Sequence, residues 1–590
     1  MRRYRSQALS TALAVVPLLG LSTVCHAATV TNPICPTEFA EFNPDTGSDI
    51  VIPPGFTVSV FKTGLNVPTG IAFRGNSQNF EVYILESGHG LPSRCNEQGS
   101  FGTGTFDPNN PFTPDILVFN PAGTLLRKLA KPTAAGGGLQ PAGPAIDIAF
   151  ENGLQGGRLF ATDSNQATHG GGQNNSSRIV IVDPMTGAVT PFITGLPTGD
   201  HPTEQLEFKG GWIYWSQGST TNSGVVGLDN NGGANEPDIP CQDITLSQNV
   251  FISSLGPPQV ATSGYSLFGH TNPGGTVKAF FNASTGQVRQ GVCDGATLRA
   301  RLNDPTTLQP VGWGHRNGYA IRFAPDNHPL AGQLLVGEDG ADERGARPSN
   351  GAPEVLSLDQ QNPDGTPVYH GWPDVYGFLP SSQAVFNPLG GPSDDLCQAP
   401  NSFPACVPTV LHFDVPIRDV LAFPPQQITS PLAIEAADSS FTGIDFVPKS
   451  FVRDPVEDGS VLYSLEGDFG FSPANASAAP AGTQQVVPVP EVGHEVKLIN
   501  FNQDLSQPLQ LKIQRFAHNV TDEQAFPNGL SGFNRPTNVK FGPDGCAYVV
   551  DYGAVRDGGQ SDPASGVLTP GDGPLVQFPG TGVIWKICPQ

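Results

Sequence analysis

Charged and polar side chains recur at two fixed positions of a motif that the sequence repeats. The start of the motif carries imidazole, guanidinium and amide groups, on His201, His315, Arg316, Asn317 and Arg535. Its end carries mostly carboxylic acids, on Glu86, Asp163, Gln217, Glu338, Asp339, Glu466, Asp468 and Asp551. An imidazole with a pKa near ~6.5 accepts protons, a guanidinium group binds anions, and carboxylates bind divalent cations. Gathered in one concave place, these groups would form a site for binding or for acid–base catalysis.

The repeated motif is typical of a β-hairpin: a strand, a tight turn, a second strand and then a polar residue. The clearest copy spans residues 535–551, and the others span 67–86, 144–163, 201–217, 315–339 and 441–468. A further strand-like run follows each copy, which gives about four strands per repeat. Six such repeats predict an all-β fold, a six-bladed β-propeller.

The hairpin geometry predicts where the polar groups lie. Because a hairpin reverses the chain, the residue that enters its first strand and the residue that leaves its second strand share one end. We therefore expect the entering and leaving residues of all six repeats to surround one funnel on the propeller axis. For Glu86, Asp163 and Asp551, which recur at one position of the repeat, a repeated structural hydrogen bond is also expected. For His315, a packing role is favoured over a functional one.

The composition excludes several classes of function. The 590 residues carry a formal net charge of −23, and only 14% of the residues are charged. A strongly acidic chain lacks the basic surface that nucleic acids or anionic membranes require. The sequence also lacks a nucleophile-elbow motif, a zinc-protease helix motif, a phosphate-binding loop and a dinucleotide fingerprint. These absences argue against a nucleotide cofactor.

The N-terminus has the pattern of a secretory signal. Basic residues at 2, 3 and 5 precede an apolar run at 8–21, and a small-residue cleavage site follows near Ala27. We expect residues 1–27 to be a signal peptide, 28–50 an N-terminal extension, and 51–590 the propeller. Long insertions are expected at about 241–275 and 379–430. These features predict a secreted or periplasmic protein without a membrane span.

The cysteines are consistent with export. Removal of Cys25 with the signal would leave eight, an even number that indicates disulfides in an oxidising compartment. Cys397 and Cys406 would close one loop, and Cys546 and Cys588 would lock the last blade. The pairs Cys241–Cys293 and Cys35–Cys95 remain, although the sequence alone leaves the pairing open.

Several motifs together resemble the soluble quinoprotein glucose/sorbosone dehydrogenases. The opening Ile-Pro-Pro-Gly-Phe at 52–56 is similar to the entry strand of that family, and Gly-Asp-His at 199–201 is similar to its catalytic-histidine loop. Gly-His-Arg-Asn at 314–317 resembles its Arg-Asn motif, and the stretch from 337 to 373 resembles its calcium-binding segment. The resemblance covers about residue 51 to the C-terminus. It implies a six-bladed propeller that uses pyrroloquinoline quinone (PQQ) and calcium.

The resemblance also implies roles for individual residues. His201 would accept the proton of a sugar hydroxyl group, and Arg316 would orient or polarise the quinone. Asn317, Arg535 and Thr537 would contact the cofactor. The calcium ligands would be Gly340, Ala341 and Glu354. The chain departs from the family where Thr537 and Glu466 replace basic or histidine residues and where Gln217 replaces an acid.

Three functions follow as hypotheses. The first is a PQQ-dependent sugar or aldose dehydrogenase with a small sugar as substrate, an external electron acceptor, and a monomeric or homodimeric state. The second is a calcium-dependent propeller hydrolase, for example a lactonase, in which the metal activates water. The third is a non-catalytic propeller that binds a carbohydrate or a protein. The fold alone does not decide among them.

Overall fold

The structure analysed is a computed structural model of the chain. It describes residues 28–33, 36, 39–88, 110–133, 135–141, 143–165, 176–227, 236–253, 260–341, 347, 352–383, 385–386, 415–426, 428–467, 492–502, 509–526, 529–557 and 575–590. The expected signal peptide and four of the predicted disulfide cysteines (Cys35, Cys95, Cys397 and Cys406) lie outside these ranges, as does Asp468.

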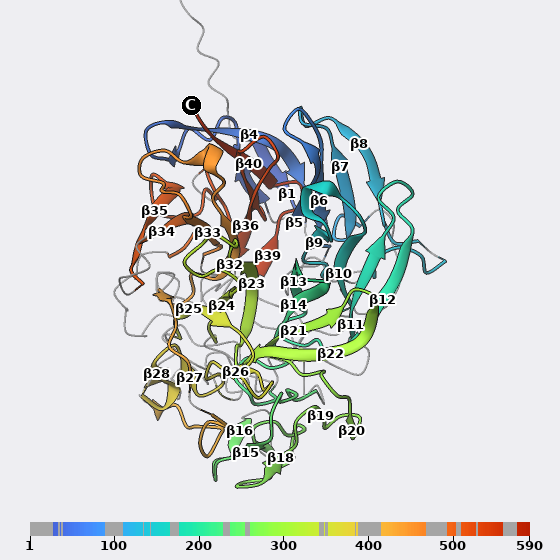
Figure 1. Cartoon of the computed structure of the whole chain (residues 1–590), viewed down its shortest axis with the longest axis vertical. Coiled ribbons are helices and arrows are strands. Elements are labelled where there is room, and N and C mark those ends of the chain that lie inside the picture. Colours follow the sequence, from blue (N-terminus) through green and yellow to red (C-terminus); the bar gives the residue numbers. More distant parts are fainter. Residues whose placement is uncertain are drawn as a thin grey trace, which may run out of the picture.

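Each of the six hairpin motifs forms the first two strands of its own antiparallel sheet. In chain order these inner pairs are β5 (Pro68–Asn76) with β6 (Asn79–Glu86), β9 (Ile148–Phe150) with β10 (Leu159–Asn165), β13 (Thr203–Lys209) with β14 (Trp212–Gln217), β23 (Asn317–Phe323) with β24 (Leu334–Asp339), β32 (Phe441–Phe446) with β33 (Val461–Leu465), and β36 (Pro536–Phe541) with β37 (Ala547–Asp551). We number the sheets as blades 1 to 6 in this order. The predicted all-β, six-bladed propeller is therefore confirmed (Figure 1).

Two further strands complete each blade on its outer side. They are β7 (Asp115–Phe119) and β8 (Leu125–Leu129) in blade 1, β11 (Ser176–Val182) and β12 (Val189–Leu196) in blade 2, β21 (Ala296–Arg301) and β22 (Asp304–Trp313) in blade 3, β25 (Glu354–Asp359) and β31 (Ala433–Glu435) in blade 4, β34 (Glu495–Phe501) and β35 (Leu511–Asn519) in blade 5, and β40 (Gly582–Pro589) and β4 (Phe56–Leu65) in blade 6. A short strand, β3 (Ile50–Val51), also pairs with β35.

The ring closes by pairing the two ends of the propeller. Strand β4, near the start of the chain, pairs antiparallel with β40 at its end, and the inner strands of blade 6 contact β5 of blade 1. The predicted disulfide between Cys546 and Cys588 is present in the same blade and fastens β40 beside β37. Closure therefore depends on both strand pairing and a covalent link.

Polar side chains on the inner strands bind the main chain of neighbouring blades. Asn538 Nδ2 on blade 6 donates to Thr69 O on blade 1, and Thr69 Oγ1 donates to Ala145 O at the start of blade 2. Gln205 Nε2 on blade 3 reaches past blade 4 and donates to Thr442 O on blade 5. Such bonds satisfy buried carbonyl groups where the blades converge on the axis.

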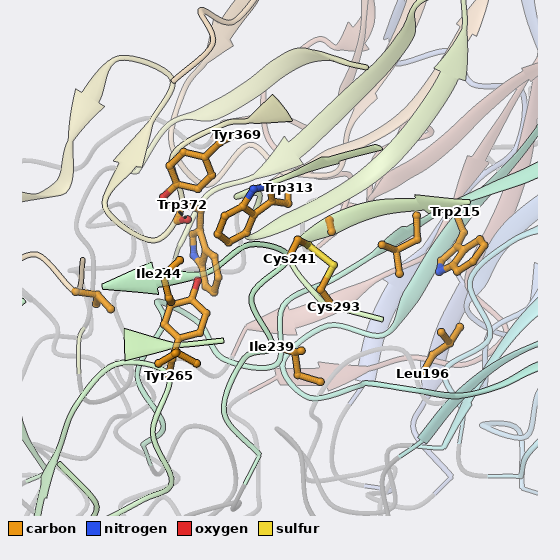
Figure 2. Close-up of a cluster of buried hydrophobic side chains, with 14 of the residues drawn as sticks. Leu196, Trp215, Ile239, Cys241, Ile244, Tyr265, Cys293, Trp313, Tyr369 and Trp372 are labelled. Carbon is orange, nitrogen blue, oxygen red and sulfur yellow. Dashed lines mark hydrogen bonds between the residues drawn. A yellow bond between two sulfur atoms is a disulfide. The ribbon is translucent and has the colours of Figure 1, made fainter. Parts of the chain in front are cut away.

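The hydrophobic core lies between the faces of adjacent blades. Inner strands such as β6 are almost wholly buried, as expected for strands covered on both faces. The largest cluster joins blades 2 and 3 to the segment that follows β14. It contains Trp215, Trp313, Tyr369 and Trp372 and the predicted disulfide Cys241–Cys293 (Figure 2). The tryptophans of this region are thus packing residues.

Two long insertions lie together beside blades 3 and 4 (Figure 1, bottom of the view). The first, between β14 and β21, holds β15 (Ile244–Thr245), β16 (Phe251–Ser253), β17 (Val260–Thr262), β18 (Thr276–Val277), β19 (Phe281–Asn282) and β20 (Gln287–Val288). The second, between β25 and β31, holds β26 (Val368–Tyr369), β27 (Val375–Tyr376), β28 (Leu379–Pro380), the 3₁₀ helix η3 (Ser381–Gln383), β29 (Val385–Phe386) and β30 (Val415–Pro416). A bridge between Leu246 and Leu421 links the two, and β26 extends blade 3 in parallel with β22.

Two small hairpins and two 3₁₀ helices complete the elements of the described residues. The hairpins are β1 (Ala28–Thr31) with β2 (Phe39–Phe42), and β38 (Val555–Asp557) with β39 (Leu575–Gln577); the 3₁₀ helices are η1 (Gly153–Gln155) and η4 (Lys449–Phe451). Within the described ranges, none of the helices has the length and apolar character needed to cross a membrane.

Replacing both Cys546 and Cys588 with Ser should lower the free energy of unfolding by about 4 kcal/mol, because their disulfide closes a chain segment with a sequence separation of 42. Denaturant titration of the oxidised wild type and the double variant measures the difference. Each single variant also lacks the bond and should lose a similar amount of stability, so the single variants separate the effect of the bond from the effect of the second substitution. An unchanged stability of the double variant would contradict a role of this disulfide in holding the last blade.

Candidate functional site

The entering and leaving residues of blades 4 and 6 meet as the hairpin argument predicts. Asn317 pairs with Asp339 across blade 4, and its Nδ2 donates to Asp339 Oδ2 at 3.0 Å. The amide of Arg535 donates to Asp551 Oδ1 at 2.9 Å, as the amide of Arg316 does to Glu338 Oε1 at 2.8 Å. The carboxylates that end the second strands therefore cap the starts of the first strands.

In blades 1 and 2 the corresponding acids have structural partners. Glu86 accepts from the amide of Asn66, and Asp163 accepts from the amide of Gln140 and from Arg178. The repeated structural hydrogen bond expected for these carboxylates is confirmed. Residues that could do chemistry are accordingly concentrated on blades 3 to 6.

His201 lies beside a buried ion pair at the start of blade 3. Its Nδ1 is 3.7 Å from Asp200 Oδ2, and Arg316 Nη2 donates to the same oxygen at 3.0 Å. The His201 side chain is 17% exposed, whereas the Arg316 side chain is only 3% exposed. An imidazole next to a carboxylate and open to the surface can accept a proton at its other nitrogen.

The main chain around His201 is held tightly against blade 4. The amide of His201 donates to Ser219 O at 3.0 Å, and the amide of Ser219 donates to Arg316 O at 2.8 Å. A Cβ atom at Gly218 would lie 2.3 Å from the Cβ of His201 and 3.0 Å from Asn317 Oδ1. Glycine at 218 therefore allows His201 and Asn317, which come from different motifs, to approach each other.

One of the predicted calcium ligands, Gly340, contacts Arg316. Gly340 O accepts a hydrogen bond from Arg316 Nη1 at 2.6 Å, and the Gly340 amide donates to Glu354 Oε2 at 3.0 Å. Burial and the nearby Asp339 raise the pKa of Glu354 well above its usual value. Ala341 is buried in the largest hydrophobic cluster. A calcium ion does not fit this set as arranged, because the guanidinium group already occupies the Gly340 carbonyl.

A second acid, Glu204, lies close to these groups, although the hairpin argument did not single it out. Its side chain is buried, and Oε2 has no hydrogen-bond partner among the described residues. Burial first, and then the charges of Asp339 and Glu466, raise its pKa well above the usual value. The sequence feature that could have identified Glu204 is its position three residues after His201, near the start of an inner strand.

Arg535 and Glu466 form the part of the site on blades 5 and 6. Arg535 is almost fully buried, and its Nη1 donates to Gly467 O at 2.9 Å. Burial raises the pKa of Glu466 to about 7, although the charge of Arg535 acts in the opposite direction. Burial and Arg535 lower the pKa of the neighbouring His494 to about 3, so that its ring is neutral. The sequence analysis did not single out His494.

Thr537 and Gln217, which the sequence predicted at the site, have hydrogen-bond partners elsewhere. The Thr537 hydroxyl donates to main-chain oxygens of Pro68 or Val550 at the junction of blades 6 and 1. Gln217 accepts from the hydroxyl of Thr203 and donates to Pro197 O. Both side chains therefore have structural roles in this arrangement, and a cofactor contact by Thr537 stays a prediction.

The remaining groups offer buried hydrogen-bonding atoms and positive charge to a ligand. Asn317 Oδ1 and Glu204 Oε2 are buried polar atoms without partners among the described residues. Arg316 and Arg535 supply positive charge from blades 4 and 6. The raised pKa of Glu204 favours its neutral form, which can donate a hydrogen bond instead of repelling an anion.

Comparisons with known proteins were made for the whole chain. No family model matches it, and no curated protein matches it. Among solved structures, it is similar to the PQQ domain of pyranose dehydrogenase from Coprinopsis cinerea, with 12% identity, a TM-score of 0.46, and coverage of 91% of this chain and 97% of that chain. It is also similar to the soluble aldose sugar dehydrogenase from Escherichia coli, with 11% identity, a TM-score of 0.43, and coverage of 91% and 100%.

A third similar structure is the calcium structure of a Trichoderma reesei carbohydrate-active enzyme of family AA12, with 12% identity, a TM-score of 0.46, and coverage of 93% of this chain and 99% of that chain. These matches include soluble sugar dehydrogenases of the kind that the sequence motifs resemble. At such identities and TM-scores the similarity is one of architecture, and the chemistry is argued from the residues of this chain.

Replacing Arg316 with Met should raise the affinity for calcium at least about tenfold, because it removes a cation from the Gly340 carbonyl and leaves Asp200 as an added ligand. Calorimetric titration of purified protein with calcium measures the affinity. Arg535→Met is the matched control, since it removes an equal charge away from Gly340. A larger gain in the Arg535 variant would argue against the predicted calcium position.

Glu466 should make the protein less stable as the pH rises. Its pKa is about 7 when folded and 4.5 by reference, so the folded state holds an extra proton between these values. The free energy of unfolding of the wild type, relative to Glu466→Gln, should fall by about 3 kcal/mol from pH 4.5 to pH 7.

Urea titrations across this pH range measure the difference between the two proteins. Glu457→Gln, at an exposed turn, is the control and should follow the wild type. Parallel pH profiles for the wild type and Glu466→Gln would show that Glu466 does not take up the extra proton.

Proposed function

We propose that the chain is an exported oxidoreductase that oxidises a sugar hydroxyl or aldehyde group with a bound quinone, PQQ, as the electron acceptor. The observation that carries the proposal is the group formed by His201, Asp200 and Arg316, with Asn317 alongside. Among the described histidines of the site, His201 has the exposed ring, while His315 and His494 are buried. A base that meets a soluble substrate has to be reachable from outside.

The chain's own residues account for the proton transfer. Asp200 lies on the Nδ1 side of His201, and Nε2 is assigned the proton of a substrate hydroxyl group. Asp200 then stabilises the imidazolium ion, and Arg316 holds Asp200 in place through the 3.0 Å ion pair. A bound quinone would supply the two-electron acceptor for the carbon–hydrogen bond.

The groups proposed to hold the quinone are Asn317 and the two arginines. Arg316 and Arg535 provide charge-assisted donors for its acidic groups, and the neutral acid of Glu204 provides a further donor. The two disulfides of the described residues suit an oxidising compartment, which supports export. The reduced cofactor would then pass its electrons to an external acceptor.

A metal-dependent hydrolase is the second candidate. Glu204, Asp339, Glu354 and Glu466 are four buried acids of the same site, and a divalent cation among them would favour their ionised forms and could activate water. Hydrolysis of a lactone with metal and without quinone would favour this candidate over the dehydrogenase.

The decisive experiment is dye reduction by the purified protein with PQQ and calcium, screened over aldoses. Replacing His201 with Ala should lower kcat at least about 10²-fold, because the general base is lost, while binding of the quinone is retained. His518→Ala removes a comparably exposed imidazole from an outer strand and should leave the rate unchanged. Absence of quinone binding at micromolar concentration would refute the proposal.

A further inference from the structure

A second group of polar side chains lies buried behind Arg316, outside the funnel site. His315 Nε2 is 3.2 Å from Asp359 Oδ1, and His370 Nε2 is 2.6 Å from the same oxygen. The two imidazole rings stack with their centroids 4.2 Å apart. One donor atom from each of the three residues lies within 4.8 Å of the others, and all three side chains are buried.

The second nitrogen of each ring is held by a partner of its own. His315 Nδ1 is 2.9 Å from Glu338 Oε2, and His370 Nδ1 is 2.9 Å from the hydroxyl of Thr429. These contacts orient both rings so that their Nε2 atoms converge on Asp359. Histidines that bind metals are held in the same way, through a carboxylate or another polar group on the nitrogen that does not bind the ion.

The hydrogen bonding of this group is incomplete. Within the described ranges, Asp359 Oδ2 and His370 Nε2 are buried atoms outside normal hydrogen-bond geometry. His370 Nε2 nevertheless approaches Asp359 Oδ1 to 2.6 Å. Such a contact is favourable when the nitrogen carries a proton or when both atoms bind the same cation.

The charges of the surrounding residues lead to the same conclusion. Glu338 and Asp359 bring two carboxylates into a region from which solvent is excluded, and the ion pairs recorded for Asp359 in the described ranges involve only histidines. Burying charge is costly unless it is paired, so positive charge must balance these carboxylates, and either a protonated imidazole or a bound cation can supply it. Gly312 permits the burial, since a Cβ there would lie 2.2 Å from Asp359 Oδ1.

We propose that His315, His370 and Asp359 bind a divalent transition-metal ion of the zinc type in a closed, structural site. Two imidazole nitrogens with a carboxylate suit zinc and its neighbours, whereas calcium prefers oxygen ligands alone. Asp359 can contribute Oδ2 as well as Oδ1, which would complete four donor atoms from protein alone. A closed shell of protein ligands is the mark of a structural site.

Such an ion would fasten three segments of the chain behind Arg316. Its ligands come from the segment before β23, from the end of β25 and from the segment after β26. Glu338 joins the two sites, because Oε2 contacts His315 while Oε1 accepts from the amide of Arg316. The ion would therefore fix the main chain from which Arg316 and Asn317 extend into the funnel site.

The test is elemental analysis of the full-length protein, purified without chelators and without added metal, and then refolded with zinc or cobalt. We expect one tightly bound ion per chain and, with cobalt, ligand-field absorption in the visible range. Asp359→Asn and His370→Asn should lose the ion. His328→Asn is the matched control, since His328 is a buried histidine away from this group, whose Nε2 donates to Gly459 O and whose Nδ1 accepts from the Leu330 amide.

Because the ligand variants could fail to fold, Thr429→Val provides a second, milder test. It removes only the partner of His370 Nδ1 and should weaken metal affinity about 10–100-fold, with the fold intact. A folded wild type that contains no ion and takes up neither zinc nor cobalt on refolding would overturn the proposal, and a protonated His315 would then be the counter-charge. An ion retained in both Asp359→Asn and His370→Asn would also overturn it.

Discussion

The closure of the ring is the constraint on which the rest of the structure depends. The inner strands of the blades converge on the axis, where side chains of one blade bond carbonyl groups of another. Asn538, Thr69 and Gln205 provide these hydrogen bonds from one blade to another. Strand β4 closes the circle by pairing with β40. Most of the candidate site residues lie on the inner hairpins of this closed arrangement.

The terminal carboxylates of the repeat have the same structural role on both sides of the ring. Those of blades 1, 2, 4 and 6 accept main-chain hydrogen bonds near the starts of their hairpins. In blades 3 to 6 the same positions bring His201, Arg316, Glu466 and Arg535 to one end of the ring. The two insertions lie beside blades 3 and 4, which also carry part of the candidate site (Figure 1). The sixfold architecture thus supports an asymmetric site.

Buried acids dominate the electrostatics of this site. Loss of water raises the pKa of Glu204, Glu354 and Glu466, so these groups hold protons that exposed acids would release. Neutral acids can hydrogen-bond an anionic ligand, whereas their ionised forms favour a cation. Arg316 contributes to the same balance, because it binds both Asp200 and the carbonyl of Gly340. The protonation states of these acids therefore affect whether the site favours an anionic ligand or a metal ion.

Local sequence determined the strands, the six hairpins, and the shared end of the entering and leaving residues. These depend on alternation, turns and chain reversal, which neighbouring residues control. Only the tertiary structure decided that Thr537 points to the next blade, that Gly340 O meets Arg316, and that Glu204 and His494 belong to the site. It alone brought His315, Asp359 and His370 together, because the direction of a side chain and the contacts of distant segments depend on packing across blades.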